Sequence, residues 1–186
     1  MYMKRIFFFT MFLISIYISA NAQKVFTKNG SIYFTSTAAL ENITAANNQV
    51  MSVLNTQNGE LIFSMLIKGF HFKKSLMEEH FNEDYLESDK YPKAAFKGHI
   101  ADPNKINYSK DGNYMVNVNG EMAIHGVSKE IAVAGTLSVR SGTISTTAKF
   151  SILLSDYNIA IPDMVKDKIA ETIDINITCV YEQKIE

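Results

Sequence analysis

Apolar and polar residues alternate one by one along most of this chain, which is the pattern of β-strands with one buried face. Turn-forming segments separate the alternating runs at 57–59, 110–113, 126–129 and 140–142. The alternating apolar positions are Ile32 and Phe34; Leu61, Phe63, Met65 and Ile67; Tyr114, Val116, Val118, Met122 and Ile124; Ile131, Val133, Leu137 and Val139; Ile144, Phe150, Ile152 and Leu154; and Ile173, Ile175 and Ile177. Short turns between many such runs predict an all-β, antiparallel sandwich or barrel of seven or eight strands. We favour a closed eight-stranded barrel.

One segment, Lys73 to Asn82, has helical spacing instead. Leu76, Met77 and Phe81 fall on one broad face when the residues are placed on a helix. We therefore predict a short amphipathic helix across one end of the barrel.

Two neighbouring segments are irregular. Tyr91-Pro92 ends the stretch after the helix, because proline biases the preceding residue towards extended geometry, and the next strand starts near 95–97. Segment 42–55 shows neither the two-residue alternation of a strand nor the spacing of an amphipathic helix, and we expect a helix or a loop there over an open barrel end.

The N-terminus has the features of a secretory signal peptide. Lys4 and Arg5 precede an apolar run over 6–19, and Ala20-Asn21-Ala22 is a small-x-small cleavage site. A transmembrane anchor is the alternative, but the run is shorter than the ~20 residues that cross a bilayer. We expect cleavage after Ala22, a mature domain of residues 23–186 in the periplasm or secreted, and no stable membrane insertion afterwards.

Composition excludes some classes of partner. Removing residues 1–22 takes away two positive charges and no acid, so the net charge changes from −1 to −3 and nothing attracts nucleic acid electrostatically. The single cysteine, Cys179, cannot form an internal disulfide and alternates with apolar residues, which favours a buried, inert thiol over a reactive one. Oligomeric state, a homodimer included, stays open.

Motifs for chemistry are missing from the sequence. His71 and His80 are nine residues apart, against about three to five in common zinc motifs, and neither His99 nor His125 has a partner at metal-ligand spacing. The acid pairs at 78–79 and 83–84 are better explained as a solvated helix face. The chain has no G-x-S-x-G, P-loop or G-x-G-x-x-G motif. We predict no catalytic residue and no metal site.

The large apolar residues include many flexible or polarizable side chains: the chain has twelve Phe, nine Met and nine Tyr but no Trp. Such side chains make a deformable lining for a flexible apolar ligand, and they also make an ordinary core. An eight-stranded barrel can be filled by side chains or can hold one small ligand. The residues alone do not decide between the two.

Four motifs in order resemble the YceI family of exported, lipocalin-like barrels that bind polyisoprenoid lipids. GEMAIHGVSK at 120–129 is similar to the family's G-x-L-x-I-H-G-V-T-K, and Gly30–Phe34 is similar to its first strand. The helix region resembles the family at Leu76, His80, Phe81, Tyr85-Leu86, Tyr91-Pro92 and Phe96. FSILLSDYN at 150–158 resembles an F-x-I strand followed by S-D-Y/F-G-I, with Asn158 in place of glycine; asparagine tolerates left-handed backbone geometry.

The resemblance implies a barrel whose lumen holds an apolar isoprenoid chain, such as a polyprenol or a quinone tail, and no other cofactor. Together with the inward parity of the strands, it predicts a set of lumen residues that contact the lipid: Phe34, Phe63, Met65, Ile67, Phe72, Leu76, Met77, Phe81, Phe96, Met122, Ile124, Phe150, Ile152, Leu154, Tyr157 and Ile175.

Two other classes of function stay open at this point. The first is a structural or stress-related barrel with a filled core and no ligand. The second is an enzyme acting on a lipid or quinone, which needs polar groups inside the barrel. The candidates for that role are Tyr33, Tyr157, His80 and His125, the last of which is better explained as fixing a turn by hydrogen bonding.

Overall fold

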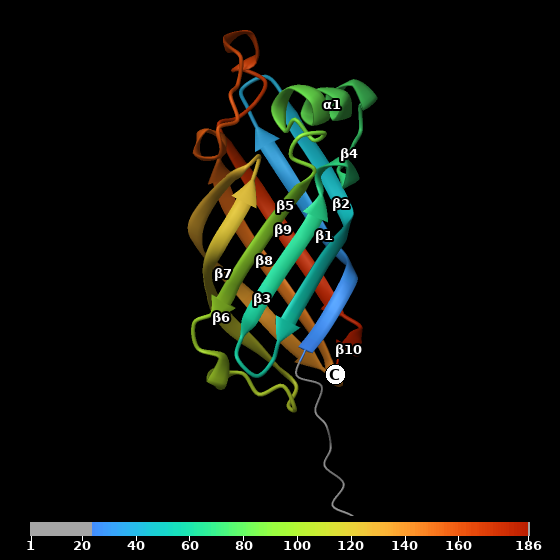
Figure 1. The fold of residues 1–186 in the computed structure, drawn as a ribbon, viewed down its shortest axis with the longest axis vertical. Helices are drawn as coiled ribbons and strands as arrows, with labels where there is room; N and C mark the ends of the chain where they lie inside the picture. The colour runs from blue at the N-terminus through green and yellow to red at the C-terminus, as the bar shows by residue number, and fades with distance from the viewer. Residues whose placement is uncertain (1–23, 186) are drawn as a thin grey trace, which may run out of the picture.

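The computed structural model describes residues 24–185, which form a closed antiparallel β-barrel of eight strands (Figure 1). Each barrel strand pairs with the next along the chain, and pairing of the first with the last over Ser31–Ser36 closes the barrel. The barrel strands are β1 (Lys24–Thr37), β2 (Asn42–Asn55), β3 (Glu60–Leu66), β5 (Lys93–Ile100), β6 (Gly112–Ile124), β7 (Val127–Arg140), β8 (Thr143–Leu153) and β9 (Thr172–Tyr181). The predicted all-β, eight-stranded barrel is confirmed.

Two further short strands extend the sheet. β4 (His71–Phe72) pairs with β2, and β10 (Gln183–Ile185) pairs with the beginning of β1. β10 lies along Lys24–Phe26, where β1 does not pair with β9.

Every second side chain along each strand points into the barrel. The register aligns Phe63 of β3 with Phe96 of β5, and Phe96 with Met122 of β6, so these three side chains form one inward row. This row follows from the pleat, which sends every second side chain to the same face.

The prediction of a helix or loop at 42–55 is wrong, because this segment is strand β2. Alternate side chains point inward in both halves of β2, but the alternation shifts by one residue between Ala45 and Asn47 in the first half and Val50 and Ser52 in the second. The pairing with β1 shifts register at the same place. A bulge of this kind breaks the alternation. Polar Asn47 and Ser52 are also fully buried, which hides the pattern further.

The turn predicted at 126–129 is shorter in the structure. The chain reverses at His125–Gly126, and β7 begins at Val127. Both residues have positive φ, 52° and 74°, the geometry with which two residues can join antiparallel strands.

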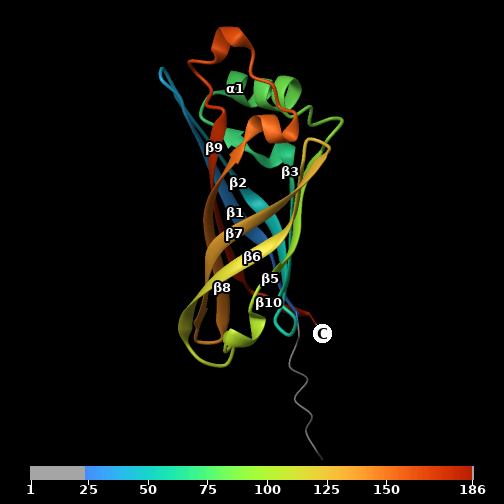
Figure 2. The ribbon, with the colours of Figure 1, turned by 90° about the vertical axis from the view of Figure 1, so that its left-hand side faces the viewer.

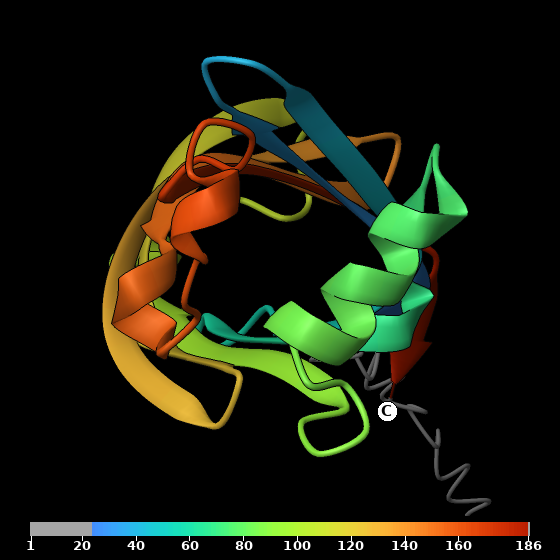
Figure 3. The same ribbon diagram turned by 90° about the horizontal axis from the view of Figure 1, so that it is seen from above.

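The predicted helix is α1 (Ser75–His80), and its helical path continues as a π-helical turn, η2 (Phe81–Tyr85). Figure 3 shows α1 and the segment that follows β8 facing each other across one end of the barrel. A cluster of four phenylalanines holds α1 and η2 against the wall. The Phe81 ring lies 5.0 Å from Phe72, 5.6 Å from Phe70 and 5.7 Å from Phe34.

The two ends of the barrel differ (Figure 2). At the end away from α1, apolar side chains fill the interior: Leu54, Leu137 and Val139 are at most 1% exposed, and Ser52 and Tyr181 share a hydrogen bond of 2.8 Å between their hydroxyls. Ile106, in the β5–β6 loop, belongs to the same cluster. We call this filled end the floor and the end under α1 the mouth.

The predicted signal peptide lies outside the described residues and stays a prediction. Within residues 24–185, no helix is long and apolar enough to span a bilayer.

Candidate functional site

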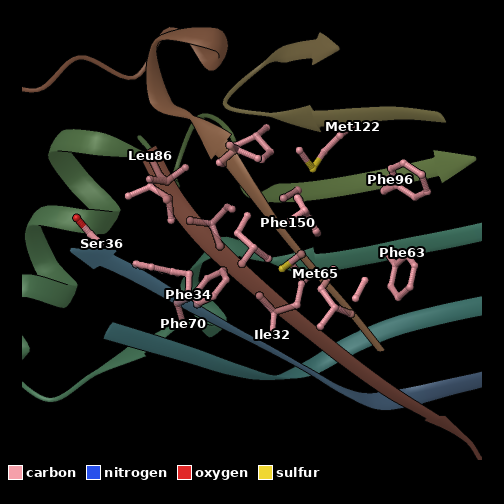
Figure 4. Close-up of a pocket in the computed structure, with 18 of the residues that line it drawn as sticks. Ile32, Phe34, Ser36, Phe63, Met65, Phe70, Leu86, Phe96, Met122 and Phe150 are labelled. Carbon is pink, nitrogen blue, oxygen red and sulfur yellow. The ribbon is translucent and has the colours of Figure 1, made fainter. Parts of the chain in front are cut away.

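An apolar cavity of about 500 Å³ occupies the barrel between the floor and α1 (Figure 4). Side chains from all eight barrel strands line it, as do α1 and the segment between β8 and β9. Its volume lies within the ~300–1,000 Å³ typical of small-molecule sites. The interior of this barrel is therefore not completely filled by its own side chains.

Fifteen of the sixteen predicted lumen residues lie on the wall of this cavity. They are Phe34, Phe63, Met65, Ile67, Phe72, Leu76, Met77, Phe81, Phe96, Met122, Ile124, Phe150, Ile152, Leu154 and Ile175. Figure 4 shows Phe34, Met65 and Phe150, from three different strands, converging on the same space. Contact of these residues with a ligand stays a prediction.

Tyr157 is the exception among the predicted residues. It is 1% exposed and packs in the apolar cluster around Ile67, Leu86 and Ile159, without forming part of the cavity wall. Tyr157 follows the end of β8 within a 3₁₀ turn, where the strand parity that predicts inward residues no longer applies.

Charged side chains on the cavity wall lie at the mouth. Lys74 and Glu41 form an ion pair of 2.9 Å, His80 Nδ1 lies 2.6 Å from Asp84 Oδ2, and Lys168 comes from the β8–β9 segment. Towards the floor the polar wall residues are uncharged threonines, such as Thr146. The cavity therefore suits an apolar chain, with a polar group accommodated only near the mouth.

Many wall residues were not among the predicted lumen residues, and those in strands, such as Ile32 and Leu137, lie at alternating apolar positions that the sequence marks. Others lie outside the strands. Phe70 and Leu86 flank the helical segment, and Val165, Lys168 and Ile169 belong to the β8–β9 segment. These residues lie outside regular strands, so the alternation that identifies inward-pointing residues in a strand is absent there. The apolar character of Phe70 and Leu86, next to a predicted helix, is the one signal that points to them.

The polar groups considered for catalysis do not gather in the lumen. Tyr33 is 43% exposed and has the outward parity of β1, and of the four candidates only His80 lies on the cavity wall. His125 Nδ1 lies 3.1 Å from the carbonyl oxygen of Tyr157, and its Nε2 lies 2.8 Å from Glu87 Oε2. His125 thus joins the β6–β7 turn to two neighbouring loops.

Two buried side chains, a thiol and a phenol, have a raised pKa, which favours their uncharged forms. Burial raises the pKa of the Cys179 thiol to about 12, and burial, with the charge of Asp156 adding to it, raises the pKa of Tyr157. A thiolate nucleophile at Cys179 is therefore disfavoured at neutral pH. Among residues 24–185, no three side chains of a metal-binding type come together.

Comparison with known proteins agrees with this architecture. The family model of the YceI-like domain matches residues 18–181. A comparison with curated proteins returned no match.

Solved structures with the same fold come from several bacteria. A polyisoprenoid binding domain from Saccharophagus degradans, implicated in plant cell wall breakdown, superposes with a TM-score of 0.76 at 14% identity over 87% of this chain and 98% of its own. BcnA from Burkholderia cenocepacia superposes with a TM-score of 0.64 at 16% identity, over 82% of this chain and 96% of its own. The YceI protein of Campylobacter jejuni superposes with a TM-score of 0.55 at 18% identity, over 79% of this chain and 87% of its own. At these identities the likeness establishes a shared fold.

Proposed function

This chain belongs to the YceI-like family, and from that membership and its apolar cavity we propose that it is an exported binding protein that holds a long apolar lipid of the polyisoprenoid or isoprenoid-quinone type. The barrel would serve to carry or store the lipid, or to respond to stress through it. Binding rather than catalysis is the activity that this cavity supports.

The observation that carries the proposal is the continuous apolar wall between the floor and the mouth. Each CH₂ group moved from water into such a site contributes ~0.8 kcal/mol, so about ten buried carbons contribute roughly 8 kcal/mol before the cost of ordering the chain. Phenylalanine and methionine side chains such as Phe34, Phe150, Met65 and Met122 can adjust to the bends of an isoprenoid. No charged partner is needed to hold the chain itself.

The neighbour from Saccharophagus degradans is described as a polyisoprenoid binding domain, which supports this class of ligand. The alternative of a ligand-free structural barrel requires a filled lumen, and the cavity argues against it. The alternative of a lipid-modifying enzyme requires reactive groups at the ligand, and His80, paired with Asp84 at the mouth, is the one candidate on the wall.

The test is extraction of the purified protein into organic solvent followed by mass spectrometry. We expect an isoprenoid lipid in amounts comparable to the protein. The delipidated protein should melt at a higher temperature after reloading with a polyprenol, because a ligand that binds only the folded state stabilises it. A parent protein with no extracted lipid and no thermal response to polyprenols or quinones would overturn the proposal.

A further inference from the structure

Several of the most exposed large apolar side chains of the structure lie at the mouth of the cavity. Among the large apolar side chains that the structure describes, the four most exposed are Met164 (93%), Met115 (83%), Leu40 (72%) and Leu76 (60%). Met115 lies on β6, whereas the other three belong to segments at the mouth. Leu40 lies in the β1–β2 loop, Leu76 in α1 and Met164 in the 3₁₀ turn at 163–165.

These three segments are joined to one another. The backbone N–H of Leu40 donates to the carbonyl oxygen of Asp167 at 2.8 Å, which ties the β1–β2 loop to the β8–β9 segment. On its other side the same loop reaches α1 through the ion pair between Glu41 and Lys74. Leu40, Leu76 and Met164 therefore belong to one continuous structure, which we call the rim.

The rim is also continuous with the cavity. Leu76 is exposed to solvent and lines the cavity at the same time, and Val165, next to Met164, lines it too. An apolar chain can thus follow apolar side chains from the outer surface to the interior.

Cationic groups accompany the apolar side chains at the rim. Lys73 and Lys168 are exposed and form no ion pair with any other residue that the structure describes, whereas Lys74 is paired with Glu41. Free ammonium groups beside apolar side chains match the layering of a phospholipid surface, in which phosphates overlie the acyl chains.

We propose that the rim docks the open end of the barrel on a phospholipid bilayer, so that a lipid passes between bilayer and cavity without crossing water. The inference rests on the proposed function, since it describes how the cavity is loaded and emptied. Exposed acids near the rim, such as Glu79 and Asp167, offset its lysines, so apolar insertion rather than net lipid charge dominates the contact. Zwitterionic vesicles therefore support docking as well as anionic ones.

The test is co-flotation of the protein with vesicles of phosphatidylcholine alone and of phosphatidylcholine mixed with phosphatidylglycerol. The triple variant Leu40→Ser, Leu76→Ser, Met164→Ser should bind both kinds of vesicle roughly tenfold more weakly than the parent. Met115→Ser is the matched control for Met164→Ser, because it removes a methionine that is also largely exposed but lies away from the rim, and it should bind like the parent. Met164→Ser alone, at the most exposed position, gives a smaller loss and tests the same point if the triple variant folds poorly.

A second measurement separates docking from ligand binding. Loading of a fluorescent polyprenol from dilute ethanol, without vesicles, should be equal in the parent and in the double variant Leu40→Ser, Met164→Ser, which changes no residue of the cavity wall, whereas loading from vesicles should be slower in this double variant. If the parent loads the probe but floats no better than the triple variant, docking is excluded and the proposed function stands. If the parent floats with vesicles but never takes up the probe, the proposed function fails while the docking surface remains.

Discussion

Met65 lines the cavity and contacts both apolar clusters of the barrel. Its side chain packs against the larger cluster, which includes Leu54 and Phe70, and against the cluster around Ile67 and Leu86. It remains only partly buried although it points inward from β3. A partly buried inward side chain is what an unfilled lumen produces.

Met65→Trp tests whether this space is available to a ligand. In a hollow barrel the larger ring can occupy the cavity, so we expect several-fold less co-purifying lipid and nearly unchanged stability of the ligand-free protein. In a solid core, overpacking typically costs about 1–3 kcal/mol. Lipid content by mass spectrometry and the free energy of unfolding by denaturant titration provide the two readouts.

Controls for this substitution come from the outer surface. Met115→Trp makes the same change at a side chain that is 83% exposed, and Lys68→Ala alters an exposed residue paired with Asp89. Both should leave lipid content as in the parent. Destabilisation of Met65→Trp by more than about 2 kcal/mol, with no lipid in the parent, would mean that the barrel is filled by its own side chains.

At the scale of elements, the β6–β7 turn shows how a two-residue connection is held in place. His125 and Gly126 both have positive φ, and the His125 ring lies edge-on to Tyr91 with centroids 4.7 Å apart. A Cβ on Gly126 would come within 2.5 Å of the Tyr91 ring. The turn thus requires glycine at 126 both for its backbone geometry and for its closeness to Tyr91.

We therefore expect Gly126→Val to destabilise the fold by about 1–3 kcal/mol through backbone strain, with the Tyr91 contact adding to this loss. His125→Ala removes two hydrogen bonds and should cost less, about 1 kcal/mol, while any bound ligand is retained. Denaturant unfolding measures both losses.

Gly142→Val is the matched control for the glycine. Gly142 also has positive φ, 79°, but a Cβ at this position would meet no atom of the described residues within 4 Å. The control should therefore lose less stability than Gly126→Val.

His125→Ala also tests the enzyme alternative. Loss of a measurable reaction in this variant, with the fold intact, would favour an enzyme over a binding protein.

At the scale of the whole molecule, the barrel is a container closed at one end. The floor is packed with side chains such as Leu54 and Leu137, both 0% exposed, and the cavity opens beneath α1. Lys24 and Ile185 pair with each other at the floor end, so the two ends of the described chain lie away from the mouth. A ligand can therefore enter at the mouth without disturbing either end.

Export is the prediction that concerns the whole chain. We expect cleavage after Ala22, because small residues stand at the cleavage site and the apolar run ends just before it. Intact-mass measurement on protein from the native host should give a chain that starts at Gln23, one residue before β1. A full-length chain retained in the membrane fraction would contradict export.

The sequence alone determined the barrel class, all barrel strands except β2, and fifteen residues of the cavity wall. Period-two alternation, as in Phe63, Met65 and Ile67, predicts both a strand and its inward face, because the pleat links sequence parity to direction. The four-residue spacing at 72–81 likewise predicts α1 and its apolar face. These are local properties, which neighbouring residues decide.

Tertiary structure alone decided the features that depend on distant residues. The bulge in β2 becomes apparent only through its register with β1, and Val165, Lys168 and Ile169 reach the wall only because their loop lies over the mouth. Whether the lumen is hollow depends on how the volumes of side chains from eight strands add up, which no local pattern reports. The cavity, its charged mouth and the exposed rim therefore follow from the closed barrel rather than from any single segment of the chain.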